Sequence, residues 1–377
     1  MAKKGLVVLG STGSIGRQTL DIIKTFPERF DLIGLAAGNN SNLLESQIEE
    51  FQPKFVYCIE ASPSIIKNKN VQLLPMEQMV VQANVDIVMV ATSGNIGLIP
   101  TIKALEKGIT VCIANKEVII MGGDLIKEIS RKSGAQLLPV DSEPSAIWQC
   151  MQGELQPIRR IILTASGGPF YNINSDELTR VTPAQALQHP TWNMGKRITV
   201  DSSTLMNKGF EVIEAHILFD VAFENIEVMI HPQSLIHSMI ELTDGSIKAQ
   251  ISPPDMRLPI QHALFYPEKV ANSMLLPFDT GVATNMELKP LDKSKYPCFT
   301  LAVEAGIKGG TYPTVLAAAD EIAVDLFLNH RISFTDIPKL VNSVLSEHQF
   351  SSADNLENIL AADTWAKLKA LSLAEAA

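Results

Sequence analysis

The feature that most constrains this chain is a regular alternation of short apolar runs with amphipathic segments in its first third. Runs typical of strands begin near residues 5, 31, 54, 86, 109 and 136, which puts them 23 to 32 residues apart. The segments between them carry apolar side chains at helical spacing, as in Ile15, Ile22 and Phe26, and Gly108 and Gly134 stand where helices should end. The alternation predicts an α/β fold with a Rossmann-like, doubly wound parallel sheet.

The pattern changes after about residue 150. The strings RRIILTAS, KRITVDSS and IEVMIHP are expected to be strands, and the Asp244-Gly245 turn predicts a hairpin. A helix is expected near Asp176 to Gln188, inside a long lid-like loop, and amphipathic helices follow residue 300. We therefore expect a first domain over residues 1–147, a central α+β domain over 148–280, a linker over 281–300 and a small helical domain over 301–377.

Composition restricts the class of protein. A chain of 377 residues with 46% hydrophobic content is large enough for several cores, and a net charge of -10 disfavours a nucleic-acid partner. No apolar run has membrane-spanning length, and the N-terminus lacks a signal sequence, so a soluble protein is expected. The four cysteines lie far apart, which favours a reducing, cytoplasmic location: Cys58, Cys112, Cys150 and Cys298.

The string GSTGSIG lies between the first expected strand and the first expected helix. Glycines there let backbone N–H groups approach a pyrophosphate, and a helix N-terminus favours negative charge. The spacing, G-x-x-G-x-x-G, differs from the more familiar G-x-G-x-x-G, so an ordinary tight turn with helix-capping serines is the alternative. The favoured prediction is a dinucleotide site that includes Gly10, Thr12, Gly13, Ser14 and Ile15.

The second expected strand ends in AAGNN, which contains no acidic residue. An NAD-binding protein usually places an acid here for the ribose hydroxyls, so its absence favours NADP. Asn39 and Asn40, after Gly38, can donate hydrogen bonds to a 2′-phosphate. The alternative is a solvated turn.

Two carboxylates, Asp141 and Glu143, follow the sixth expected strand. They are two residues apart and would lie on one side of an extended segment, where they repel one another. A bound Mg²⁺ or Mn²⁺ would relieve that repulsion, since hard cations take oxygen ligands. An acidic strand end that faces water is the alternative.

A third acid, Glu211, follows a string rich in neutral donors and one cation. This chemistry suits a phosphate beside a metal. A solvated helix residue after hydroxyls that cap the helix is the alternative. The neighbouring residues concerned are Ser202, Ser203, Asn207 and Lys208.

Other polar residues are placed where a substrate could meet them. Lys116 ends the fifth expected strand, Ser166 ends the strand after residue 158, and His237 lies on the hairpin. Each has an ordinary alternative: a surface lysine, a strand-to-loop transition and a satisfied core histidine. In the long loop, His189, Trp192 and Met194 are expected to close over a small polar substrate.

Eight strings occur in this order: GSTGSIG, ANKE, PVDSE, LTASGGPF, HPTWNMG, VDSSTLMNKGFE, HPQSLIHSM and PPDMR. Together they resemble the 1-deoxy-D-xylulose 5-phosphate reductoisomerase family over nearly the whole chain. The resemblance implies an NADP-dependent oxidoreductase that rearranges this phosphorylated keto-sugar by retro-aldol and aldol steps. NADPH then reduces the branched aldehyde to 2-C-methyl-D-erythritol 4-phosphate, in non-mevalonate isoprenoid synthesis. A homodimer is also implied.

The resemblance also assigns residues by the motifs that match. It implies metal ligands at Asp141, Glu143 and Glu211, with Lys116 beside them in catalysis. Implied substrate contacts are Ser142, Glu143, Ser166, His189, Trp192, Ser202, Asn207, Lys208, Glu211 and His237. Implied cofactor contacts add Asn115, Glu117 and Gly195 to the glycine-rich loop and to Gly38, Asn39 and Asn40.

Two residues depart from the family pattern. Pro144 stands where a histidine commonly follows DSE, and Asn39 stands where a basic residue is common. Two rival functions also remain open. One is another two-domain NADP enzyme, such as a semialdehyde dehydrogenase, but its nucleophilic cysteine would have to be Cys150 in an apparently helical run. The other is a non-catalytic NADP-sensing protein, which the three acids argue against.

Overall fold

The computed structural model describes residues 2–192, 194–281 and 285–376. The chain forms two compact units, each assembled from separate stretches of sequence. The first unit holds the residues up to Val118 together with Ile126–Ser145 and Asp255–Leu276. The second holds Ile119–Leu125, Ala146–Pro254 and the residues from Pro277 onward.

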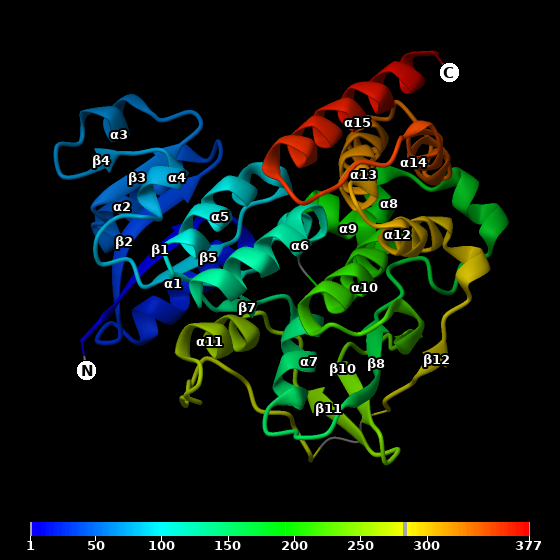
Figure 1. The fold of residues 1–377 in the computed structure, drawn as a ribbon, viewed down its shortest axis with the longest axis horizontal. Helices are drawn as coiled ribbons and strands as arrows, with labels where there is room; N and C mark the ends of the chain where they lie inside the picture. Colours follow the sequence, from blue (N-terminus) through cyan, green and yellow to red (C-terminus); the bar gives the residue numbers. More distant parts are fainter. Residues whose placement is uncertain (1, 193, 282–284, 377) are drawn as a thin grey trace. The chain divides into compact units, whose positions relative to one another are not determined.

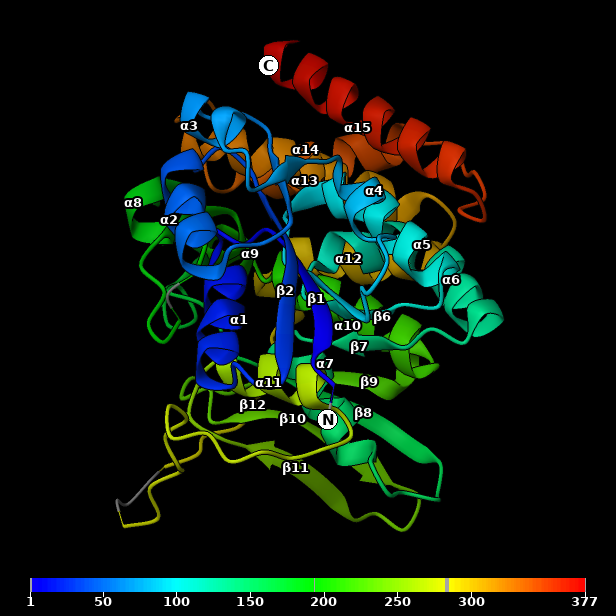
Figure 2. The ribbon, with the colours of Figure 1, turned by 90° about the vertical axis from the view of Figure 1, so that its left-hand side faces the viewer.

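The first unit is built on a parallel sheet of seven strands, in the order β4-β3-β2-β1-β5-β6-β7. Figure 2 shows α1 and α2 on one side of β1 and β2, with α4 and α5 on the other. The strands are β1 (Lys4–Leu9), β2 (Phe30–Ala37), β3 (Phe55–Cys58), β4 (Gln72–Leu73), β5 (Ile87–Val90), β6 (Thr110–Ile113) and β7 (Leu137–Pro139). The expected doubly wound sheet is confirmed, and the two-residue β4 is the only one of these strands that the apolar pattern missed.

Helices connect successive strands along the chain (Figure 1). They are α1 (Ser14–Thr25), α2 (Ser41–Phe51), α3 (Pro63–Lys67), α4 (Met76–Met79), the 3-10 turn η1 (Gly94–Gly97), α5 (Leu98–Glu106) and α6 (Lys116–Ser133), with α11 (Arg257–Phe265) added from later in the sequence. Gly134 ends α6 in the left-handed conformation, as its position predicted. Helix α7 (Ser142–Met151) follows β7 and passes from the first unit into the second.

The second unit has a mixed sheet in the order β11-β10-β8-β9-β12. Its strands are β8 (Ile158–Ala165), β9 (Ile226–Ile230), β10 (Ile236–Leu242), β11 (Ile247–Ile251) and β12 (Lys289–Pro290). β10 and β11 are antiparallel, so the predicted hairpin is confirmed, and Gly245 takes φ +86° in its turn. β12 pairs with β9, so the expected linker contributes an edge strand.

Around this sheet lie helices that include most of the last third of the chain (Figure 1). They are α8 (Pro183–Ala186), α9 (Lys196–Thr204), α10 (Met206–Phe219), α12 (Pro297–Lys308), α13 (Tyr312–Leu328), α14 (Asp336–Glu347) and α15 (Leu356–Ala376), with 3-10 turns η2 (Ser175–Arg180), η3 (Phe223–Asn225) and η4 (Lys293–Lys295). The predicted C-terminal helices are confirmed. No helix in the described residues is long and apolar enough to cross a membrane.

Two element predictions are wrong. KRITVDSS forms helix α9, because the hydroxyls of Thr199 and Ser203 bond back to helix carbonyls and the segment is buried, which outweighs its β-branched residues. The helix expected near Asp176 to Gln188 is two short pieces, η2 and α8. Thr182 and Gln185 form a capping box and Pro183 opens α8, so a new helix starts here.

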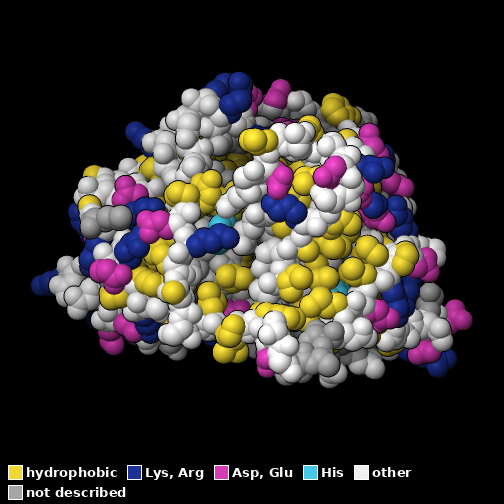
Figure 3. Space-filling model, turned by 90° about the horizontal axis from the view of Figure 1, so that it is seen from below, with side chains coloured by type: hydrophobic (Ala, Val, Ile, Leu, Met, Phe, Trp, Pro, Cys, Tyr) yellow, Lys and Arg dark blue, Asp and Glu magenta, His cyan; other side chains and the backbone are white. Residues whose placement is uncertain are grey.

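The sheet of the second unit has apolar side chains on both faces. On one face, Ile162, Ile236 and Met239 form a small cluster, with Met229 and Leu288 packed against it. Figure 3 shows hydrophobic side chains gathered on the side of the molecule where β11 lies in Figure 1.

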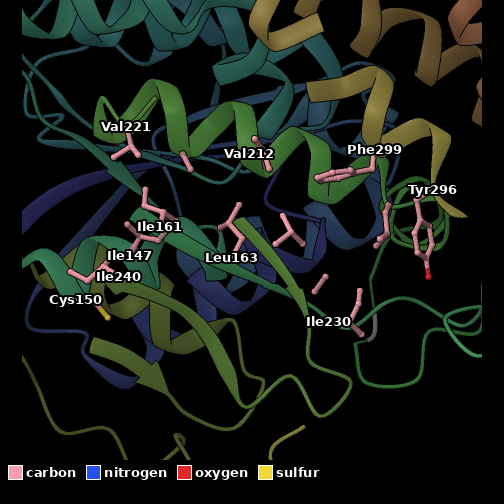
Figure 4. Packing of buried hydrophobic residues seen from close by; sticks show 14 of the residues in the cluster. Ile147, Cys150, Ile161, Leu163, Val212, Val221, Ile230, Ile240, Tyr296 and Phe299 are labelled. Carbon is pink, nitrogen blue, oxygen red and sulfur yellow. The ribbon is translucent and has the colours of Figure 1, made fainter. Parts of the chain in front are cut away.

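The other face carries the main core of this unit (Figure 4). Ile161 and Leu163 of β8 pack with Ile240 of β10, and α10 contributes Val212. Phe299 of α12 closes the cluster. Burying these side chains stabilises each by about 1.5–3 kcal/mol relative to exposure, so α10 is held firmly against the sheet.

Candidate active site

The glycine-rich loop joins β1 to α1 in the first unit, as predicted. Gly10 has φ +88°, and a Cβ there would lie 2.3 Å from the carbonyl oxygen of Ala91. A Cβ on Gly16 would lie 2.2 Å from the carbonyl oxygen of Gly10. Both positions therefore require glycine. The N-cap of α1 is Gly13, with no side-chain capping bond, so the serine-capping alternative does not describe this turn.

The turn after β2 is exposed at Gly38, Asn39 and Asn40. The Oδ1 of Asn40 accepts a hydrogen bond from the backbone N–H of Leu43 at 3.2 Å and so caps α2. The carbonyl of Gly38 accepts from the backbone N–H of Ile59 at 3.3 Å. This leaves the side chain of Asn39 and the amide nitrogen of Asn40 available to an anion.

Three consecutive residues at the start of α6 have distinct environments. Asn115 caps the helix by accepting from the N–H of Val118 at 2.9 Å, and its amide nitrogen donates to the carbonyl oxygen of Thr92 at 2.9 Å. Glu117 accepts from the N–H of Gly94 at 3.3 Å. Lys116 is 6% exposed and forms an ion pair with Asp141, so it is not the surface lysine of the alternative.

The segment that carries Asp141 and Glu143 differs from the expectation. The carbonyl of Asp141 accepts from the N–H of Ser145 at 2.9 Å, and α7 begins at Ser142, so Glu143 lies in the first turn of a helix and not on an extended segment. Pro144 is compatible with this turn because its missing N–H has no helical partner there. Ser142 donates a hydrogen bond to Glu143. The helix N-terminus stabilises negative charge on these acids.

In the second unit, β8 leads directly to Ser166. Its Oγ lies 3.0 Å from Nε2 of His189, and it accepts from the N–H of Gly168 at 3.2 Å. The Nδ1 of His189 accepts from the N–H groups of Thr191 and Trp192, at 3.2 and 2.9 Å. Because Nδ1 accepts, a neutral His189 carries its proton on Nε2 and donates to Ser166. Burial lowers the pKa of His189 to about 4.

This arrangement gives the Ser166 hydroxyl a defined polarity. Its oxygen accepts from both His189 and Gly168, which leaves its hydrogen to be donated. Gly168 has φ +66°, and a Cβ there would lie 2.7 Å from the carbonyl oxygen of Ser202. The loop after β8 can therefore approach α9 only with glycine at this position.

Helices α9 and α10 meet at Leu205, which takes φ 56° in the left-handed region. One turn later, Asn207 donates to Oε1 of Glu211 at 2.7 Å, and Lys208 pairs with the same carboxylate. Lys208 and Glu211 are 3% and 1% exposed, so Glu211 is not the solvated helix residue of the alternative. The spacing of three and four residues puts these side chains on one face of α10.

The remaining predicted residues of this unit have simpler settings. Ser202 is buried in α9, while the Ser203 hydroxyl donates to the carbonyls of Ala186 and Thr199. Ser203 therefore has a structural role. Gly195 is the N-cap of α9. Met194 is only partly exposed.

Trp192 and His237 approach one another, with ring centroids 6.1 Å apart. His237 is buried, and its Nε2 lies 3.2 Å from the carbonyl oxygen of Ser252. His237 therefore has a hydrogen-bond partner, as the alternative of a core histidine expected, and its ring also lies beside the indole of Trp192.

The sequence did not single out two residues that support these sites, the buried Gln47 and the partly exposed Arg197. Gln47 contacts the glycine-rich loop, and its signal was a polar residue on the apolar face of α2, between Leu44 and Ile48. Arg197 bonds to α13, but it lay in a string interpreted as a strand.

Cys150 does not have the setting of a nucleophile. It is 5% exposed within α7 and belongs to the apolar core of the second unit. Burial raises the pKa of its thiol, which disfavours the reactive thiolate. The semialdehyde dehydrogenase alternative loses its required residue.

Comparison with known proteins identifies the family. Models of 1-deoxy-D-xylulose 5-phosphate reductoisomerase match residues 6–123, and models of its C-terminal domain match residues 137–219 and 251–369. The proteins named 1-deoxy-D-xylulose 5-phosphate reductoisomerase of Thermodesulfovibrio yellowstonii and Thermomicrobium roseum are 47% and 48% identical to this chain. These alignments cover 97% and 98% of the chain and 97% of each relative.

Solved structures agree over the same length. The reductoisomerase from Zymomonas mobilis in complex with NADPH is 38% identical, with a TM-score of 0.91 and full coverage of both chains. A reductoisomerase in complex with NADPH, fosmidomycin and magnesium is 34% identical, with a TM-score of 0.94 over 99% of this chain and 98% of that one. This chain belongs to the 1-deoxy-D-xylulose 5-phosphate reductoisomerase family.

Proposed function

We propose that this chain converts 1-deoxy-D-xylulose 5-phosphate to 2-C-methyl-D-erythritol 4-phosphate with NADPH, as a step of isoprenoid precursor synthesis. The observation that carries the proposal is the match to reductoisomerases along almost the entire chain. A non-catalytic NADP sensor would not need the buried charges at Lys208 and Glu211, which cost free energy to desolvate.

We further propose that Asp141, Glu143 and Glu211 bind one Mg²⁺ or Mn²⁺ ion. The donor set fits the group, since it consists only of carboxylate oxygens, which hard divalent cations prefer. Three related solved structures contain magnesium. When bound, the ion supplies Lewis-acid stabilisation of negative charge on the substrate oxygens.

The phosphate of the substrate is assigned to the second unit. Ser166 has a hydroxyl hydrogen to donate, and Lys208 and Asn207 add a cation and an amide. Ser202 and His189 complete the set, with His189 acting through the orientation of Ser166. Trp192, supported by His237, excludes water when the loop closes, together with Met194. Phosphate contacts of this kind supply binding energy that orients the reacting carbons.

The cofactor and the proton chemistry are assigned to the first unit. The loop of Gly10, Thr12, Gly13, Ser14 and Ile15 presents the N-terminus of α1 to the pyrophosphate. The turn of Gly38, Asn39 and Asn40 receives the 2′-phosphate, and Asn115 and Glu117 make the other cofactor contacts of this unit. Gly195, which belongs to the second unit, is a further proposed cofactor contact. Lys116 forms an ion pair with Asp141 and places its amino group beside the reacting oxygens.

We also propose that the enzyme is a cytoplasmic homodimer with the four-part division expected from the sequence. All four cysteines are free thiols, as a reducing compartment favours. The apolar face of the second sheet offers a surface to a second copy, since Ile247 and Ile251 of β11 are 52% and 42% exposed. Sedimentation of an Ile247→Lys, Ile251→Lys variant tests this: a dimer identical to that of the unchanged protein would contradict the proposed surface.

The activity is tested by NADPH oxidation in the presence of 1-deoxy-D-xylulose 5-phosphate and Mg²⁺, with the product identified by mass spectrometry. We expect turnover that stops when the metal is chelated and when fosmidomycin is added. Absence of NADPH oxidation with both Mg²⁺ and Mn²⁺ would overturn the proposed function.

A further inference from the structure

The glycine-rich loop is tied to helix α2 by a reciprocal pair of buried hydrogen bonds. The hydroxyl of Ser11 donates to Oε1 of Gln47 at 2.8 Å, and Nε2 of Gln47 donates to the carbonyl oxygen of Ser11 at 2.9 Å. Ser11 is 0% exposed and Gln47 is 5% exposed. A buried amide with both ends satisfied in this way fixes its partners firmly, because losing either bond leaves a polar group unpaired.

The backbone of the loop is held from a second direction. The N–H groups of Gly10 and Ser11 both donate to the carbonyl oxygen of Ala36, at 2.8 Å, at the end of β2. Ser11 therefore has its N–H, its hydroxyl and its carbonyl all bonded to the β2–α2 segment. The orientation of the next peptide plane follows from these contacts.

The peptide bond between Ser11 and Thr12 is planar and trans, so its C=O and N–H point in opposite directions. Gln47 holds the carbonyl of Ser11 inward, which turns the N–H of Thr12 outward, toward the proposed pyrophosphate site. The same helix α2 is capped at its N-terminus by Asn40, in the turn proposed for the 2′-phosphate. One helix thus connects the two phosphate-binding parts of the cofactor site.

We infer that Gln47 is a positioning residue for NADPH, which sets the orientation of the Ser11–Thr12 peptide and couples it to the turn at Asn39 and Asn40. The inference rests on the cofactor site proposed above. Gln47 does not touch the cofactor. Its loss should therefore weaken NADPH binding without changing the reacting groups, so KM for NADPH rises while kcat at saturating NADPH stays the same.

The test compares Gln47→Met with the unchanged enzyme, because Met keeps the length of the side chain and removes both hydrogen bonds. We expect KM and Kd for NADPH to rise about tenfold, since two buried hydrogen bonds are lost. We expect kcat and KM for the sugar phosphate to change less than about twofold. Kd is measured directly from the fluorescence of the bound nicotinamide.

Gln261→Met is the matched control. Gln261 is 6% exposed in the same unit, where it donates to the carbonyl oxygen of Val270 at 2.9 Å and accepts from Asn272 at 2.7 Å. The Gln261→Met variant loses comparable side-chain hydrogen bonds, but these lie away from the glycine-rich loop. We expect it to lower stability and leave Kd for NADPH unchanged. Equal increases in Kd for both variants would assign the effect to general destabilisation and overturn the inference.

If Gln47→Met does not fold, the Ser11→Ala variant tests the inference instead. It removes the hydroxyl but keeps the bond from Gln47 to the carbonyl, so Kd for NADPH should rise by only about two- to fivefold. An unchanged Kd in every folded variant of this pair overturns the role of Gln47. Failure of the proposed function looks different, since the unchanged protein would then show no turnover of 1-deoxy-D-xylulose 5-phosphate, whatever its Kd for NADPH.

Discussion

Buried charges at single residues carry most of the proposed chemistry. Lys208 and Glu211 are nearly inaccessible, and their pair lies within one turn of α10. Desolvating such a pair costs several kcal/mol for each ion, which mutual attraction repays only with good geometry. The hydrogen bond from Asn207 adds to that geometry. A buried pair of this kind is weak evidence for stability, and the proposed metal and phosphate contacts would give these charges a role.

Glu211→Gln is predicted to abolish turnover and to leave NADPH binding intact, because it removes a proposed metal ligand outside the cofactor unit. Several kcal/mol of charge stabilisation correspond to a loss of about a thousandfold or more in kcat. Steady-state assays with saturating Mg²⁺ and fluorescence titration with NADPH measure the two effects. Full activity in this variant would refute the metal assignment.

Glu241→Gln serves as the control for this prediction. Glu241 is also a buried acid of the second unit, paired with Arg159 at 3.0 Å and Arg160 at 2.5 Å, but it lies on β10 away from the proposed ligands. Its loss should lower stability while turnover persists.

His189 gives a prediction about pH. Burial lowers the pKa of His189 from 6.5 to about 4, so between these values the unfolded chain binds a proton that the folded protein does not. Its contribution to stability is therefore complete above pH 6.5 and is lost as the pH falls toward 4. We expect His189→Asn to show a smaller decrease of Tm over this window than the unchanged protein. A His262→Gln variant is measured over the same pH window for comparison, since burial lowers the pKa of His262 to about 4 as well. Parallel Tm curves for His189→Asn and the unchanged protein would contradict the prediction.

At the scale of elements, α9 links the long loop to α10, the helix proposed to contact the substrate phosphate. Arg197, in its first turn, donates to the carbonyl oxygen of Ala317 and to Glu321, both at 3.1 Å. Its guanidinium also lies 3.9 Å from Asp320 of α13, which is 0% exposed. Arg197 thus fastens α9 to α13.

Arg197→Met is predicted to reduce the free energy of unfolding by about 3–5 kcal/mol, because the buried carboxylate of Asp320 loses this cation. KM for the sugar phosphate should rise with it, since α9 loses its anchor. Urea unfolding measures the first effect and steady-state kinetics the second. Adding Asp320→Leu to this variant should restore much of the stability. Failure to do so would show that the charge of Asp320 does not cause the loss of stability.

At the scale of the whole molecule, the chain forms two units and enters each of them more than once. The cofactor loop and two of the proposed metal ligands belong to the first unit, and the third ligand and the phosphate contacts belong to the second. The turn at Asn39 and Asn40, proposed to set the nucleotide preference, lies in the first unit.

The enzyme is predicted to prefer NADPH to NADH, because the turn at Asn39 and Asn40 has no acid to repel a 2′-phosphate or to bind the ribose hydroxyls. We expect kcat/KM for NADPH to exceed that for NADH by at least about tenfold, and Asn39→Asp to reduce the ratio. Both are measured with saturating sugar phosphate and Mg²⁺. Equal kcat/KM for the two cofactors would count against the assignment of this turn.

Local patterns in the sequence were sufficient for the first sheet. Periodicity predicts six of its seven strands. Backbone geometry that only glycine adopts predicts the loop at Gly10 and the end of α6 at Gly134. Both are local properties of the sequence. The hairpin at Gly245 follows for the same reason. The ordered strings across the chain also gave the family, which the relatives confirm.

Only the tertiary structure decided the rest. α9 is helical despite its β-branched residues because burial and hydroxyl-to-carbonyl bonds outweigh local propensity, and Glu143 lies on a helix because Asp141 accepts the first helical hydrogen bond. Gln47 reaches Ser11 across 36 positions of sequence, and Arg197 reaches Glu321 across 124. Such contacts depend on which surfaces the folded chain brings together, and no local pattern of residues encodes them.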